Sequence, residues 1–79
     1  MPKLPVVSGP EFVKALMKAG YEVTNRRGDH VVLRYRRDDP TTAITVPLHR
    51  ELKKGTLSTL LKHNEKITCM ARDELLKML

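Results

Sequence analysis

The spacing of the apolar residues changes twice along this chain, and this restricts the fold more than any other feature. Residues 9–19 carry apolar side chains at helical spacing, three short segments within residues 21–46 alternate apolar with polar, and helical spacing returns after residue 56. A period near 3.6 indicates an amphipathic helix, whereas a period of two indicates a half-buried strand. With 79 residues in all, we expect one domain over residues 1–79.

The first helix is predicted over residues 9–19 because a capping box precedes it. In the tetrapeptide that runs from Ser8 to Glu11, the hydroxyl and the carboxylate can each satisfy a backbone N–H of the first turn. Pro10 fits in that turn, where its missing N–H costs nothing. Gly20 supplies a C-terminal stop.

Three strands are predicted to follow as an antiparallel meander, over residues 21–26, 30–36 and 42–46. Tyr21 and Val23 are expected to face the core from the first strand, which makes it half-buried. A connector is then predicted to lead to a helix over residues 56–63 that stops at Asn64, and Thr68 is predicted to cap a last helix over residues 69–78.

The order helix, three strands, helix, helix predicts an α+β two-layer sandwich with a three-stranded antiparallel sheet. All helices then cover one face of the sheet, and the other face, here called the open face, is left to solvent or to a ligand. We expect the open face to display polar side chains: Thr24, Arg26, His30, Arg34, Arg36 and Thr45.

The charge balance indicates a polyanionic partner. Fifteen Lys and Arg stand against nine Asp and Glu, which leaves a net charge of +6. Nucleic acid and an acidic protein both fit this charge. Three aromatic residues and no Trp are too few for a base-stacking platform, so contacts to the phosphate backbone are favoured.

Other classes of function lack sequence support. No apolar stretch approaches the roughly 18 residues of a membrane helix, and residues 1–5 are too rich in proline for a signal peptide, so we expect no membrane partner and a cytoplasmic location. The single Cys69 allows no intrachain disulfide and no zinc ribbon. Dinucleotide, P-loop and hydrolase motifs are absent, and we expect neither a metal nor a cofactor.

Among the histidines, His30 is the best candidate for chemistry. An imidazole can take up or release a proton at cellular pH, and guanidinium groups can hold a phosphodiester against it. Metal-free RNA cleavage needs this pairing, because a base removes the ribose 2′-OH proton while cations stabilise the charge that develops on phosphorus. The alternative is an exposed strand histidine without a task. Four arginines flank it: Arg26, Arg27, Arg34 and Arg36.

Further along the chain, His49 lies in the connector, where it is either a second acid or base, a phosphate contact, or a bystander. Lys53 and Lys54 precede a predicted helix N-terminus, where backbone N–H groups and ammonium groups either converge on a phosphate or remain solvated. His63 is expected to cap its helix through the dipole. Cys69, at the expected start of the last helix, is expected to be structural.

Taken together, four segments resemble the HicA (YcfA-like) family of small toxins from prokaryotic toxin–antitoxin modules. They are residues 5–9, 19–21, 27–34 and 46–57, and the last is the most specific, with the sequence Val-Pro-Leu-His-Arg-Glu-Leu-Lys-Lys-Gly-Thr-Leu. The resemblance covers nearly the whole chain. It implies a double-stranded-RNA-binding-domain-like fold, α-β-β-β-α, which agrees with the order of elements derived above.

The resemblance also implies an activity and partners: ribosome-independent cleavage of mRNA, silenced by a cognate HicB antitoxin. The family's catalytic histidine follows a glycine and usually a serine at the start of the second strand, which is His30 here. This chain has Gly28 in the turn but Asp29 in place of serine. The carboxylate can orient the imidazole or repel RNA phosphate, and the alternation of strand residues does not assure a contact with His30.

The sequence and the resemblance together predict a metal-independent endoribonuclease toxin with His30 as general acid/base. The second proton donor is either His49 or a lysine. The predicted RNA contacts are Arg26, Arg27, Arg34, Arg36, Lys53 and Lys54. Two alternatives are a non-catalytic RNA-binding module and a basic protein whose main task is to dock an acidic antitoxin-like partner.

Overall fold

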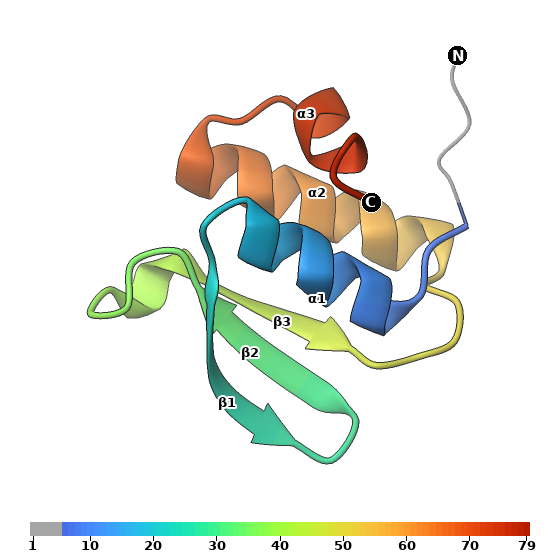
Figure 1. Cartoon of the computed structure of the whole chain (residues 1–79), viewed down its shortest axis with the longest axis horizontal. Coiled ribbons are helices and arrows are strands. Elements are labelled where there is room, and N and C mark those ends of the chain that lie inside the picture. The colour runs from blue at the N-terminus through green and yellow to red at the C-terminus, as the bar shows by residue number, and fades with distance from the viewer. Residues whose placement is uncertain (1–5) are drawn as a thin grey trace.

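The computed structural model describes residues 6–79, so residues 1–5, including Pro5 of the N-terminal segment, lie outside the described part. The helices and strands are α1 (Gly9–Lys18), β1 (Glu22–Arg27), β2 (His30–Arg34), a 3₁₀ turn η1 (Pro40–Thr42), β3 (Ala43–Pro47), α2 (Lys54–Thr68) and α3 (Arg72–Leu76). The strands form one antiparallel sheet in the order β1-β2-β3, and the helices lie together on one side of it (Figure 1). The predicted α+β class and strand order are confirmed.

The capping box at the start of α1 is confirmed. The backbone N–H of Glu11 donates to Ser8 Oγ at 3.2 Å, and the backbone N–H of Ser8 donates to Glu11 Oε1 at 3.1 Å. The hydrogen bond from the Ser8 backbone holds the pKa of Glu11 below its ordinary value. The chain therefore enters α1 along a fixed path, which matters because this helix end packs against the end of β3.

The core lies between the helices and the covered face of the sheet. Its most deeply buried side chains come from α1, β2, β3, α2 and α3: Phe12, Leu16, Leu33, Ile44, Val46, Leu57, Leu61 and Leu75. β1 contributes none, because all six of its residues are exposed. The prediction of a half-buried first strand is therefore wrong: Tyr21 is buried but precedes the strand, and Val23 is 41% exposed. β1 is the edge strand that lies farthest from the helices in Figure 1.

A bulge in β1 changes which arginine shares a face with His30. The register shifts between Val23 and Asn25, so that Arg26 pairs with Val31 and Arg27 pairs with His30. Residues directly opposite each other in an antiparallel pair lie on the same face. Arg27 therefore lies on the open face, and the predicted placement of Arg26 there is wrong, because one extra residue reverses the alternation.

β2 ends at Arg34, two residues earlier than predicted, so Arg36 lies beyond the strand. The side chain of buried Thr42 takes the place of a strand partner: its Oγ1 accepts from the backbone N–H of Arg36 at 3.0 Å and donates to the Asp39 carbonyl at 2.7 Å. The turn is held further by Asp39, whose carboxylate accepts from the side chain and backbone of Thr41; these hydrogen bonds lower the pKa of Asp39.

The predicted stop of the second helix at Asn64 is wrong, because α2 continues to Thr68. Asn64 is fully buried, and its Oδ1 accepts a 2.9 Å hydrogen bond from the Tyr21 hydroxyl. Burial raises the pKa of Tyr21, which keeps this phenol protonated as the donor. This long-range hydrogen bond satisfies the buried amide oxygen of Asn64, whereas Nδ2 of the same amide is buried without a hydrogen-bond partner within residues 6–79. His63 is consequently an exposed residue inside the helix, and its predicted role as a cap is wrong.

The C-terminal segment also differs from the prediction. Thr68 ends α2 instead of starting a helix: its hydroxyl donates to the Asn64 carbonyl at 2.9 Å and accepts from the backbone N–H of Met70 at 3.1 Å. Cys69 is the left-handed C-cap of α2, with φ of 61°, and thus lies at a helix end. The last helix is α3, shorter than predicted and preceded by Ala71, and it anchors Leu75 in the core.

Candidate active site

The start of β2 positions His30 at the hairpin end of the sheet. Gly28 has a positive φ of 54°, as predicted for the turn between β1 and β2. His30 pairs with Arg27 on one side and with Pro47 on the other. Because Val31 is buried against the helices, alternation places His30 on the open face, where its side chain is 51% exposed.

The loop between β3 and α2 brings His49 to the same end of the molecule. The backbone N–H of Leu48 donates to the Asp29 carbonyl at 2.6 Å, which joins this loop to the β1–β2 turn. In Figure 1 the turn and the loop lie at the same side of the molecule, at the right of the view. His49 therefore follows directly after a residue that is fixed to the turn carrying Asp29.

Gly9 holds the other side of this loop. Its backbone N–H donates to the His49 carbonyl at 2.8 Å. A Cβ at this position would collide with the carbonyl oxygen of Pro47 and would lie 2.7 Å from Leu48 Cα. Only glycine therefore lets the start of α1 approach the end of β3 so closely. The sequence gives no local signal for this role, because the contact joins segments far apart in the chain.

One carboxylate lies between the two imidazoles. Asp29 Oδ1 is 2.9 Å from His30 Nδ1, and Asp29 Oδ2 is 3.7 Å from His49 Nε2. The three side chains are 64%, 51% and 57% exposed, respectively, so a substrate can reach them. Asp29 belongs to the turn and not to the strand, so the alternation of strand residues does not separate it from His30. We call Asp29, His30 and His49 the histidine cluster.

Basic side chains continue from the cluster along the open face. Arg27 is exposed beside His30, and Arg34 lies four residues further along β2, about 14 Å at the usual rise of a strand. Arg34 lines a hollow between β1 and β2 together with Arg37, and its Nη1 donates to the Arg37 carbonyl at 3.0 Å. Arg37, which the sequence analysis did not select, also forms an exposed ion pair with Glu22 at 3.7 Å.

The two candidate lysines belong to the helix layer. Lys53 is the N-cap of α2, without a side-chain cap hydrogen bond, and Lys54 is its first residue; both are exposed. The start of α2 lies at the same side of the molecule as the end of β3 in Figure 1. The structure therefore brings together Arg27, Asp29, His30 and His49, and it does not place the lysines on the open face.

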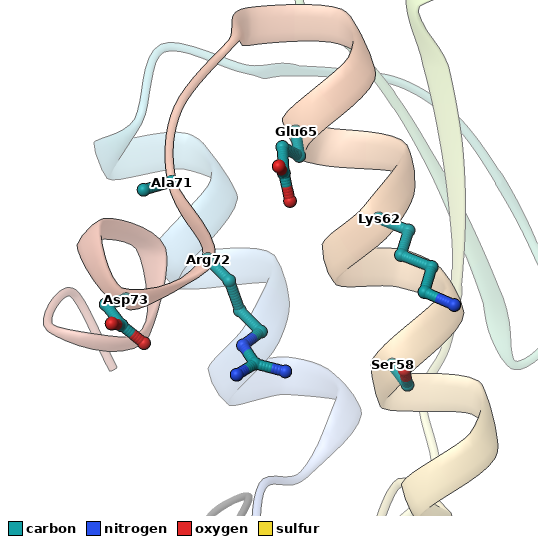
Figure 2. A pocket seen from close by; sticks show the side chains of 6 residues that line it. All are labelled: Ser58, Lys62, Glu65, Ala71, Arg72 and Asp73. Atoms are coloured by element: carbon teal, nitrogen blue, oxygen red, sulfur yellow. The ribbon is translucent and has the colours of Figure 1, made fainter. Parts of the chain in front are cut away.

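A separate hollow lies between α2 and α3, away from the sheet. Figure 2 shows Lys62 and Glu65 on α2 and Arg72 near the start of α3 around it. It shares no residue with the histidine cluster. Within residues 6–79, no group of three or more His, Cys, Asp or Glu side chains has the arrangement of a metal site, and no helix is long and apolar enough to cross a bilayer.

The fold and the site define a small α+β protein of the double-stranded-RNA-binding-domain-like kind, with His30 and arginines on the open face of its sheet. The family model described as HicA toxin of bacterial toxin–antitoxin systems matches residues 9–65, and the chain belongs to this family. The matched segment contains the whole sheet and the histidine cluster, whereas α3 lies outside it. No curated protein and no solved structure matches the chain.

Proposed function

We propose that this toxin is a metal-independent, ribosome-independent endoribonuclease that cleaves mRNA through His30 and is silenced by a HicB-type antitoxin protein. The observation that carries the proposal is the placement of His30: it is half exposed on the open face, contacts the Asp29 carboxylate at 2.9 Å, and lies opposite Arg27. Membership of the HicA toxin family supports the same activity and the same partners.

The chemistry follows from the ribose 2′-OH. His30 takes the 2′-OH proton, the resulting alkoxide attacks the adjacent phosphorus, and the bond from phosphorus to the 5′-oxygen breaks. The products are a 2′,3′-cyclic phosphate and a 5′-hydroxyl end, so a second group must protonate the leaving oxygen. Arg27 and Arg34 can hold the phosphates of the strand and stabilise the charge that develops on the phosphoryl oxygens.

A second candidate function is RNA binding without cleavage. The exposed carboxylate of Asp29 favours it, because a negative charge beside His30 repels the scissile phosphate. In this case the protein binds RNA through the open face, and substitution of His30 changes affinity alone.

The test is cleavage of end-labelled RNA by the purified, partner-free protein in excess EDTA. We expect the wild type to leave 5′-hydroxyl ends and His30→Ala to cut about 10² to 10⁴ times more slowly, since this is the usual contribution of a positioned acid or base. His63→Ala is the matched control, because His63 is an exposed histidine inside α2. Equal cleavage by His30→Ala and by the control overturns the proposed role of His30, and binding without cleavage by the wild type supports the second candidate.

A further inference from the structure

We infer that His49 donates the proton to the leaving 5′-oxygen and that Asp29 is the positioning residue that holds His30 and His49 at one phosphate. This inference rests on the proposed ribonuclease function and adds to it the second proton carrier. Its basis is the geometry of the histidine cluster, in which the two oxygens of one carboxylate face two imidazoles, at 2.9 Å from His30 and at 3.7 Å from His49.

Each imidazole has one nitrogen near the Asp29 carboxylate and a second nitrogen that exchanges a proton with the substrate. Asp29 Oδ1 lies 2.9 Å from His30 Nδ1, so the negative carboxylate favours the tautomer with the proton on Nδ1, and Nε2 keeps the lone pair that a general base needs. Asp29 Oδ2 lies 3.7 Å from His49 Nε2, an ion-pair distance, so the other ring nitrogen, Nδ1, is the one that carries the proton for the leaving group. Asp29 thus faces one nitrogen of each imidazole, and the other nitrogen of each ring takes part in the proton transfer.

The backbone around His49 supports this role. The backbone N–H of Leu48, the residue before His49, donates to the Asp29 carbonyl at 2.6 Å. The carbonyl of His49 accepts from the backbone N–H of Gly9 at 2.8 Å. A proton donor whose backbone is fixed on both sides loses little freedom when substrate binds. The alternative donors, Lys53 and Lys54, begin α2 in the helix layer, and their side chains form no hydrogen bond and no ion pair within residues 6–79 that would direct them toward His30.

In the complete step, the 2′-OH proton moves to His30 Nε2 as the bond from O2′ to phosphorus forms. The bond from phosphorus to O5′ breaks, and O5′ receives the proton of His49 Nδ1. His30 ends protonated and His49 ends neutral, and exchange with water restores both. Asp29 keeps its charge throughout and touches neither the phosphorus nor the leaving oxygen.

A substrate with sulfur in place of the 5′-bridging oxygen tests His49, because a thiolate leaves without being protonated. We expect His49→Ala to cut ordinary RNA about 10² to 10⁴ times more slowly than the wild type and to cut the 5′-thio substrate at nearly the wild-type rate. His30→Ala is expected to lose activity on both substrates. If His49→Ala cuts ordinary RNA normally, or is equally slow on both substrates, His49 is not the acid. If His30→Ala is unimpaired on both, it is the proposed function that fails.

Asp29 is tested by a readout that does not depend on cleavage. In ¹⁵N spectra of the imidazole rings, we expect neutral His30 to carry its proton on Nδ1 in the wild type, and to move toward the Nε2–H form in Asp29→Asn. Asp38→Asn is the control, since it removes an exposed carboxylate beyond the far end of β2. An unchanged His30 tautomer in Asp29→Asn overturns the positioning role, whether or not the protein cleaves RNA.

Discussion

The two faces of β2 differ in what their side chains do, although these side chains alternate along a single strand of five residues. Val31 and Leu33 point to the helices and are at most 5% exposed. The residues that alternate with these two lie on the open face and are exposed or partly exposed: His30, Val32 and Arg34. The comparison teaches that the sheet stabilises the protein through one face and leaves the other free for chemistry, so substitutions should affect stability or activity according to face.

The largest effect is expected for Leu33→Ala on the covered face. Leu33 has no exposed surface, and removing its side chain leaves a cavity between the sheet and the helices, so we expect the free energy of unfolding to fall by about 2 to 5 kcal/mol. Urea unfolding followed by circular dichroism measures this change. Val32→Ala, at the neighbouring position on the open face, is the control, and its free energy of unfolding should fall clearly less. Equal losses from the two variants would mean that the open face also carries the stability of the fold.

The order of the elements could be predicted because it depends on local chemistry. The capping box at Ser8, the positive φ of Gly28 and the change of period at residue 20 each act over a few residues, and each is found in the structure. The errors arose where a distant partner overrides local preference. The local preference of asparagine favours a helix end at Asn64, but its hydrogen bond with the Tyr21 hydroxyl stabilises it inside α2. The bulge in β1 likewise depends on how this strand pairs with β2.

The site was predictable only in part for the same reason. His30 and Asp29 are neighbours in the sequence, and both were selected from it. That Asp29 also faces His49 depends on the backbone hydrogen bond between Leu48 and Asp29, which joins two segments that the sequence keeps apart. Residue type therefore marked His49 as a candidate, whereas only the fold shows which partner it meets.

An intermediate effect is expected for Gly9→Ala, which connects the fold to the site. The new Cβ would collide with Pro47, so α1 and the loop carrying His49 must move apart, and we expect a loss of more than about 1 kcal/mol. Gly55→Ala is the matched control: its Cβ meets nothing within 4 Å, and alanine in a helix should stabilise by up to about 1 kcal/mol. Thermal unfolding of both variants measures the difference, and a stable Gly9→Ala protein would contradict the close approach.

The smallest effect is expected on RNA binding, where two adjacent arginines, Arg26 and Arg27, compare the two faces of the sheet. Arg27 lies opposite His30 on the open face, and Arg26 lies opposite Val31, so the same change of charge is made on opposite faces. We expect Arg27→Ala to weaken binding of a 2′-deoxy-substituted RNA strand, which cannot be cleaved, and to lower the slope of log K against log salt by about 0.7, the value for one contact to a single strand. Arg26→Ala should keep the wild-type slope. If both variants lower the affinity and the slope by the same amount, RNA binding depends on the overall charge of the β1–β2 hairpin and not on which arginine lies on the open face.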